Sequence, residues 1–181
     1  MITRTNLTRS KLANIYWNMW NRCYLESYLE KNPKYRGCTI CDEWLNDRES
    51  FYDWIAENYY IIEDEQIDLD KDILVKGNKI YSPDTCIFAP HVINTYFERI
   101  TRSPQKTNNG KYSMEITVNG KRINLGTFGT EEEAKLEYIK HKQAAILSKA
   151  DEYKGRIPKK LYDAMINYRI DLADWDKEKA A

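Results

Sequence analysis

The sequence is poor in the residues that make a chain flexible, and it has no long apolar run. Among its 181 residues only 7 are glycine and 5 are proline, so the sequence predicts no long flexible linker. No apolar stretch approaches the roughly 20 residues that span a bilayer, and we expect no membrane partner. The first residues also lack the apolar segment of a signal peptide, so we expect the protein to stay in the cytoplasm where it is made.

Histidine and cysteine are also scarce, which narrows the choice of metal and catalytic sites. The chain has 2 histidines and 4 cysteines. In a cytoplasmic protein, cysteines are expected to be reduced thiols. Cys38 and Cys41 have the spacing of a zinc-binding pair, and Cys23 and Cys86 would complete four ligands, but a single such pair is a weak indication. We favour four small buried thiols over a zinc site.

The chain has no net charge, yet its charges are unevenly distributed. The 28 Lys and Arg residues equal the 28 Asp and Glu residues, which by itself does not favour a nucleic-acid partner. Acidic residues exceed basic ones over 51–100, whereas basic residues exceed acidic ones over 101–150. The second region is therefore the better candidate for contact with a polyanion, and the first for a cation site.

The apolar content is sufficient for a packed core. Hydrophobic residues make up 42% of the chain and aromatic residues 13%, which predicts a globular protein of one to two domains. Helical spacing of apolar residues predicts helices over 8–29 and 48–58, and further helices after Pro90 and Pro158.

The region that follows residue 110 changes from helical spacing to strict alternation. Apolar and polar residues alternate from Tyr112 to Val118, which is typical of a half-buried strand. Asn119-Gly120 is the strongest two-residue signal for a hairpin and predicts a return strand. Thr130, followed by three glutamates, is expected to cap a helix. The chain as a whole is predicted to have an α+β fold.

The run GKYSMEITVNGKRINLGTFGTEEEAKLEY, residues 110–138, resembles the DNA-binding domain of the APETALA/ethylene-response-factor family. Its most specific piece is LGTFGTEEEA at 125–134. The resemblance covers about a quarter of the chain. It implies a three-stranded antiparallel sheet packed on a helix, with the sheet placed in the major groove of double-stranded DNA.

The resemblance and the alternation together select the residues that would face DNA. Arg and Lys can bind phosphates or read guanine, and Asn and Gln can read adenine. Thr107 and Thr117 stand where the family has arginines, and Asn124 where it has a tryptophan, so a different DNA sequence is expected to be bound. The predicted DNA-binding residues are Arg102 and Gln105 on a first strand at 101–107, Lys111, Ser113, Glu115 and Thr117 on the second, and Arg122, Asn124 and Thr127 on the third.

The first half of the chain resembles phage proteins that are variants of HNH homing endonucleases. Four pieces carry this resemblance in the same order as in that family: YWNMWNRC (16–23), GCTICDEW (37–44), DLDKDI (68–73) and YSPDTC (81–86). The resemblance implies a helical, irregular domain around two strands and a helix (a ββα site), and a phage or mobile-element origin in a bacterial host cell. We therefore predict an HNH-like domain at 1–99, a three-stranded domain at 100–150 and a helical C-terminal tail at 151–181.

An active HNH site combines a divalent metal, such as Mg²⁺ or Mn²⁺, with a histidine that activates water. Under the resemblance, Asp70 is the metal-binding carboxylate. Lys71 stands in the position of the catalytic histidine and Thr85 in that of an asparagine. Asn94, as a second metal ligand, or His91 would complete the site. A protonated lysine is a poor base, so any cleavage of DNA is expected to be weak.

The predicted function is therefore that of a DNA-binding protein related to HNH homing endonucleases, with weak metal-dependent nicking of DNA as its expected residual activity. Two alternatives remain open. One is a non-catalytic DNA-binding regulator, which the loss of the histidine and asparagine favours. The other is a phage inhibitor that binds a host or phage protein through the acidic surface of 51–84. No small-molecule substrate is expected in any of the three cases.

Overall fold

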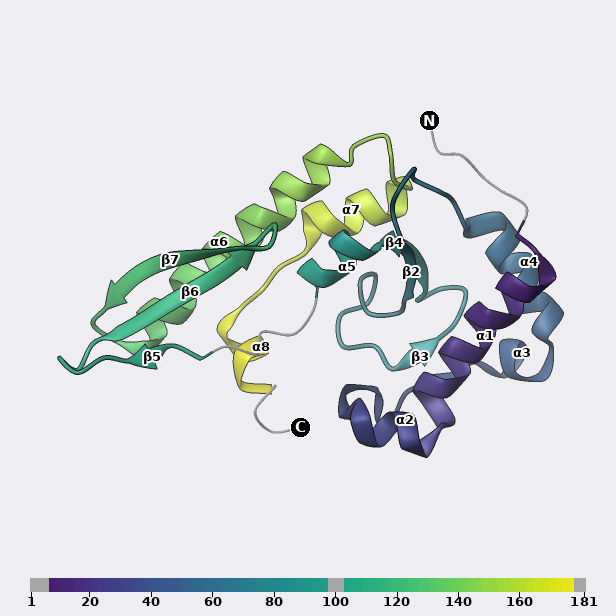
Figure 1. Cartoon of the computed structure of the whole chain (residues 1–181), viewed down its shortest axis with the longest axis horizontal. Coiled ribbons are helices and arrows are strands. Elements are labelled where there is room, and N and C mark those ends of the chain that lie inside the picture. Colours follow the sequence, from purple (N-terminus) through teal and green to yellow (C-terminus); the bar gives the residue numbers. More distant parts are fainter. Residues whose placement is uncertain (1–6, 98–102, 178–181) are drawn as a thin grey trace. The chain divides into compact units, whose positions relative to one another are not determined.

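The structure, a computed structural model, describes residues 7–97 and 103–177 and has the α+β fold that the sequence predicted (Figure 1). The chain divides into two compact units. The first consists of Met1–Thr95 with Gly155–Ala164, and the second of Tyr96–Lys154 with Met165–Ala181. None of the described helices combines the length and apolarity that crossing a membrane requires.

The first unit begins with helices. Thr8 caps the first one by accepting a hydrogen bond from the Lys11 amide. The single helix expected at 8–29 is instead two, because the backbone of Leu25 is extended (φ −85°, ψ 106°). The elements are α1 (Arg9–Tyr24), α2 (Glu26–Lys31), the 3-10 turn η1 (Pro33–Tyr35), α3 (Asp42–Asn46) and α4 (Arg48–Asn58).

An aromatic core holds these helices together. Tyr16 and Met19 of α1 are buried, three residues apart on the side of the helix that packs inward. The Trp44 ring lies 4.7 Å from the Phe51 ring, measured between centroids, and both side chains are fully buried. Aromatic pairs at such distances add to the free energy gained from burying their area.

Two short strand pairs follow in the first unit. β1 (Thr39–Ile40) pairs in parallel with β3 (Ile80–Tyr81), and β2 (Ile67–Asp70) pairs antiparallel with β4 (Ile87–Pro90). The helix expected after Pro90 is α5 (His91–Tyr96), which follows β4 without a loop. Because there is no loop between them, the first turn of α5 lies beside β2, the strand that pairs with β4.

The second unit contains the three-stranded antiparallel sheet that the sequence predicted. Its strand order is β5-β6-β7, with β5 (Gln105–Lys106), β6 (Tyr112–Val118) and β7 (Lys121–Phe128). Asn119 and Gly120 have φ angles of 51° and 72°, the left-handed conformation that a tight hairpin needs. Met114 and Ile116 are buried on the face toward α6 (Glu131–Glu152).

The C-terminal residues contribute to both units instead of forming a separate tail. They contain α7 (Lys159–Asn167) and α8 (Leu172–Lys177). Leu161 is fully buried in the first unit. In the second unit, Trp175 packs in one cluster with Met114 and Ala134. The α6 helix also extends to Glu152, beyond the predicted domain boundary at 150.

Candidate functional site

The outer face of the three-stranded sheet collects the polar residues of three separate segments. In an antiparallel sheet, directly paired residues lie on the same face. Ser113 pairs with both Gln105 and Thr127. Glu115 pairs with Asn124 and Thr117 with Arg122, while the intervening Met114 and Ile116 point to the core. We call this surface the polar sheet face and define it by Gln105, Ser113, Glu115, Thr117, Arg122, Asn124 and Thr127.

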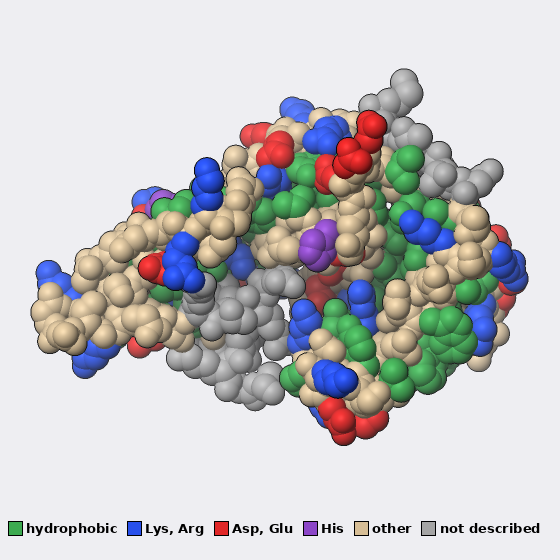
Figure 2. Space-filling model, viewed as in Figure 1, with side chains coloured by type: hydrophobic (Ala, Val, Ile, Leu, Met, Phe, Trp, Pro, Cys, Tyr) green, Lys and Arg blue, Asp and Glu red, His purple; other side chains and the backbone are tan. Residues whose placement is uncertain are grey.

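The chemistry of the polar sheet face is mixed, with exposed hydrogen-bonding groups and a charged pair. Arg122 Nε lies 3.5 Å from Glu115 Oε2, and the Arg122 side chain is 66% exposed. Asn124 Oδ1 accepts a hydrogen bond from the Gly126 amide at 2.7 Å, which holds its side chain in place. Few hydrophobic side chains are visible over β6 and β7, where basic groups lie among polar atoms (Figure 2).

Two more residues belong to the predicted DNA-contacting set. Lys111 is exposed in the turn before β6, where its carbonyl oxygen accepts hydrogen bonds from the amide and the hydroxyl of Thr107. Arg102 lies outside the described residues. Within the described part of the predicted first strand, residues 103–107, only Gln105 and Lys106 are in β5, so this part is less extended than expected.

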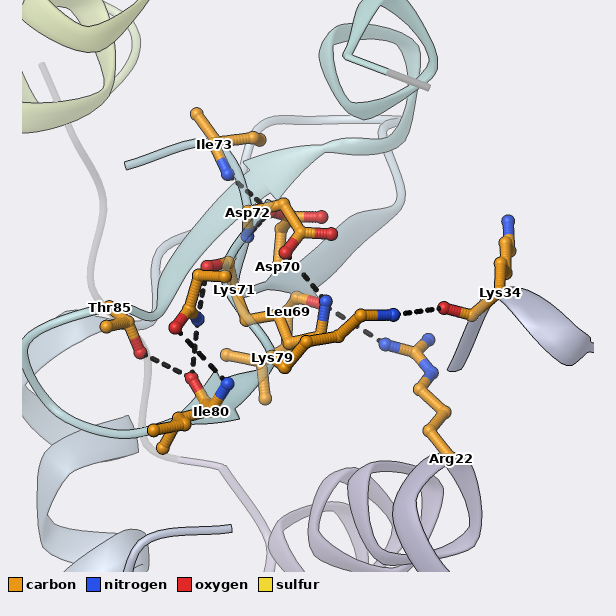
Figure 3. Close-up of polar contacts among 11 residues, drawn as sticks. Arg22, Lys34, Leu69, Asp70, Lys71, Asp72, Ile73, Lys79, Ile80 and Thr85 are labelled. Carbon is orange, nitrogen blue, oxygen red and sulfur yellow. Dashed lines mark hydrogen bonds and ion pairs between the residues drawn. The ribbon is translucent and has the colours of Figure 1, made fainter. Parts of the chain in front are cut away.

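Asp70, the predicted metal-binding residue, is engaged with the backbone of its own loop (Figure 3). One oxygen, Oδ1, accepts hydrogen bonds from the amides of Asp72 (2.6 Å) and Ile73 (2.8 Å). Burial raises the pKa of the Asp70 carboxyl, and the nearby charge of Asp72 raises it further. Among the described residues, no hydrogen bond joins Asp70 to His91 or Asn94.

Lys71 lies in the loop before β3 and Thr85 in the turn after it, and both make structural contacts (Figure 3). Lys71 Nζ donates to Asp72 Oδ1 at 2.7 Å and lies 5.7 Å from the centre of the Tyr81 ring. Thr85 Oγ1 donates to the Ile80 carbonyl at 2.7 Å. Asn78, which the sequence did not single out, joins these two segments by donating to the carbonyls of Lys71 and Ile80.

His91 and Asn94 converge on a different carboxylate, that of Asp68. His91 Nδ1 lies 2.6 Å from Asp68 Oδ2, and Asn94 Nδ2 lies 3.5 Å from the same oxygen. Gln66 Nε2 donates to the other oxygen, Oδ1, at 2.7 Å. Burial acts to raise the pKa of Asp68, but the hydrogen bonds from His91 and Gln66 outweigh it, so the pKa is lowered.

The choice of Asp68 over Asp70 follows from strand register. Asp68 pairs with Ala89, two residues before His91, and α5 starts at once after β4. Asp70 pairs with Ile87, two pairs further from α5, where β2 ends and the backbone turns. The spacing of the acids in DLDKDI (68–73) does not by itself say which acid meets the helix.

The cysteines are all free, and three of them, Cys23, Cys38 and Cys86, are buried. Burial raises the pKa of Cys23 and Cys86 to about 12, which keeps both as neutral thiols near neutral pH. Zinc ligation needs thiolates. Within 7–97 and 103–177, no group of three or more His, Cys, Asp and Glu side chains is arranged to hold a metal ion.

The chain was compared with protein families, curated proteins and solved structures, and these comparisons found no relative. No family model, curated protein or solved structure matches the chain.

Proposed function

We propose that this protein binds double-stranded DNA through the polar sheet face. The observation that carries the proposal is the register of the sheet, which brings six of the predicted DNA-contacting positions on β6 and β7, and Gln105 on β5, to one exposed surface. A twisted antiparallel ribbon with one apolar face buried has its other face free for the major groove. The basic excess of residues 101–150 supports the same partner.

The side chains of this face supply both kinds of contact that DNA recognition uses. Arg122 and Lys111 are suited to phosphates or to guanine. Gln105 carries an amide that can hydrogen-bond with adenine, and Asn124 presents its NH2 group while its oxygen is held by Gly126. Glu115 orients the Arg122 guanidinium. Its carboxylate would be repelled by a DNA phosphate, which disfavours any position of the sheet in the groove that brings Glu115 next to the backbone.

Weak metal-dependent nicking by the first unit is the second candidate activity, in keeping with a relationship to HNH nucleases. The supporting observation is the antiparallel β2–β4 pair followed directly by α5, with two of the predicted catalytic residues, His91 and Asn94, in that helix. Lys71 argues for weak activity. Its ammonium group is buried and paired with Asp72, so it offers no lone pair to a water molecule.

DNA binding is tested by electrophoretic mobility shift with the full chain over a range of salt concentrations. We expect a complex at low salt that weakens as salt rises, because phosphate contacts release counterions. The double variant Arg122→Ala/Lys111→Ala should bind more weakly and reduce the slope of log K against log salt by about one per lost phosphate contact. The control, Lys140→Ala/Lys159→Ala, loses the same charge on α6 and α7 and should bind as the wild type does.

Adding Mn²⁺ and supercoiled plasmid to the same experiment separates the three functional classes. Nicked plasmid that increases with Lys71→His would support a weakened nuclease. Plasmid that is shifted but intact would indicate a DNA-binding regulator. No shift at low salt, with the chain folded by circular dichroism, would contradict DNA binding and would favour the protein inhibitor.

A further inference from the structure

We propose that Asp68, His91 and Asn94 form a binding site for one first-row transition-metal dication. The proposal goes beyond DNA binding and does not depend on it, because the metal alone is the probe. It also differs from the site that the family resemblance implied, in which Asp70 is the carboxylate ligand. We refer to the three residues as the Asp68 cluster.

Three donor groups of different chemistry meet in the Asp68 cluster. The carboxylate comes from β2, and the imidazole and the amide come from the first turns of α5, three residues apart on one side of the helix. Both helix groups lie within 3.5 Å of a single carboxylate oxygen, Asp68 Oδ2. Convergence of donors from two elements on one atom leaves little rearrangement for a cation to bring about.

The rearrangement that a metal would require is small. A dication takes its nitrogen and oxygen ligands at about 2.1 Å, which separates neighbouring ligand atoms by about 3 Å. The His91 Nδ1 to Asp68 Oδ2 distance of 2.6 Å must therefore open by a few tenths of an ångström. The Asn94 amide must turn so that its oxygen faces the ion, and His91 must bind as the neutral tautomer that carries its ring proton on Nε2 and leaves Nδ1 free for the ion.

The carboxylate is held in place and the opposite side of the cluster is open. The Asp68 side chain is 15% exposed, and Gln66 fixes its second oxygen at 2.7 Å. A hydrogen bond of this kind orients a ligand and commonly changes metal affinity about 10–100-fold when it is lost. The His91 side chain is 59% exposed, so water has access to complete the coordination shell. A histidine side chain is visible at the surface over α5 (Figure 2).

The donor set selects the class of metal. Carboxylate and amide oxygens suit Mg²⁺, Ca²⁺ and Mn²⁺, whereas imidazole nitrogen suits zinc and the later transition metals. A site with both is better matched to Mn²⁺, Co²⁺ or Zn²⁺ than to Mg²⁺ or Ca²⁺. Mn²⁺ is the best probe here because it binds thiols weakly, and the chain has 4 cysteines.

The chain contains its own control, since the second histidine also contacts a carboxylate. His141 Nε2 lies 3.1 Å from Glu137 Oε1, one turn away on α6. Lys140 donates to the same carboxylate oxygen at 3.2 Å, so a cation there would have to displace an ammonium group. The His141–Glu137 pair therefore has the same two donor types as the Asp68 cluster, with a competing positive charge where the cluster has Asn94.

The experiment is a titration of the full chain with Mn²⁺, followed by the paramagnetic resonance signal of the free hexaaquo ion. We expect one ion bound per chain. Asp68→Asn and His91→Ala should each weaken binding about tenfold or more, and Asn94→Asp, which adds a second carboxylate, should strengthen it. His141→Ala and Glu137→Gln should leave the affinity unchanged. Asp70→Asn should also leave it unchanged, which separates the proposed site from the one based on the resemblance.

A second readout keeps the test independent of whether each variant folds. In the proton spectrum of the wild type, Mn²⁺ at substoichiometric amounts should broaden the imidazole signals of His91 and leave those of His141 sharp. Equal broadening of both histidines, or an affinity that Asp68→Asn does not change, would overturn the proposal. Loss of DNA binding in the mobility-shift experiment would leave it intact, because no DNA is present in this titration.

Discussion

Two aspartates that are two residues apart on the same strand have different environments. Asp68 faces His91 and Asn94, and hydrogen bonds lower its pKa. Asp70 accepts from two backbone amides, and burial raises its pKa. Side-chain spacing alone makes these residues equivalent, so the difference comes from where β2 ends and where α5 begins.

Asp70 is expected to stabilise the loop that follows β2. Asp70→Ala leaves the amides of Asp72 and Ile73 without their acceptor, so the free energy of unfolding should fall by about 1–3 kcal/mol. Asp70→Asn keeps an oxygen acceptor and should cost less. Urea denaturation of the three proteins at neutral pH measures both differences, and equal losses for Ala and Asn would contradict the role of the two hydrogen bonds.

The raised pKa of Asp70 predicts how the stability difference between the wild type and Asp70→Asn changes with pH. Between the pKa of the unfolded chain, about 4, and the higher pKa of the folded protein, the folded state binds more protons than the unfolded state. The contribution of Asp70 to stability therefore decreases as pH rises through this window. Because Asp70→Asn cannot titrate, its stability relative to wild type should improve with rising pH, and a difference that is flat from acid to neutral pH would contradict the shift.

At the scale of the element, α6 begins at the Thr130 cap that the sequence predicted, and the structure adds a return contact from Glu133. The Glu133 amide donates to Thr130 Oγ1 at 3.1 Å, and Glu133 Oε2 accepts from the Thr130 amide at 3.1 Å. The same carboxylate oxygen accepts from the Gly129 amide at 2.9 Å. These contacts hold the end of β7 against the start of the helix that covers the sheet.

Removal of this cap should measurably weaken the second unit. Thr130→Ala is expected to lower the free energy of unfolding by about 1 kcal/mol, because one amide of the first turn loses its partner. Thr130→Ser retains the hydroxyl and serves as the matched control. Thermal unfolding of both variants, followed by circular dichroism, provides the measurement. If Ser is as damaging as Ala, then the methyl group and not the hydroxyl accounts for the effect.

For the whole molecule, the C-terminal segment is a structural part of both units. Leu161 and Met165 are fully buried, and Trp175 is 2% exposed. Gly155–Ala164 belongs to the first unit, whereas Met165–Ala181 belongs to the second. A protein shortened to residues 1–150 therefore loses core residues from each unit and should have a lower melting temperature than the full chain.

A single substitution tests whether the C-terminal segment supplies core residues without shortening the chain. Leu161→Ala should lower the free energy of unfolding by about 2–5 kcal/mol, the range for a large buried side chain replaced by alanine. Leu147→Ala on α6, where the leucine is 39% exposed, removes the same atoms from a more exposed position and should cost much less. Similar losses for the two variants in urea denaturation would mean that Leu161 is not a core residue of the first unit.

Local sequence was sufficient for the features that depend on neighbouring residues. Alternation from Tyr112, the Asn119-Gly120 pair and the Thr130 cap predicted the hairpin and the helix that follows it, since each signal acts over a few residues. The start of α5 after Pro90 was predicted for the same reason. The residues of the polar sheet face on β6 and β7 could also be predicted from the sequence. The hairpin turn sets the register, and strand periodicity then assigns each residue to one face.

Tertiary structure alone decided the features that depend on distant residues. The parallel pairing of β1 with β3 joins segments about 40 residues apart, and no local pattern specifies it. The inclusion of Leu161 in the first unit follows from packing across an even longer separation. The same holds for the Asp68 cluster. Its residues come from two elements, and only the register of β2 against β4 determined that Asp68, and not Asp70, meets His91.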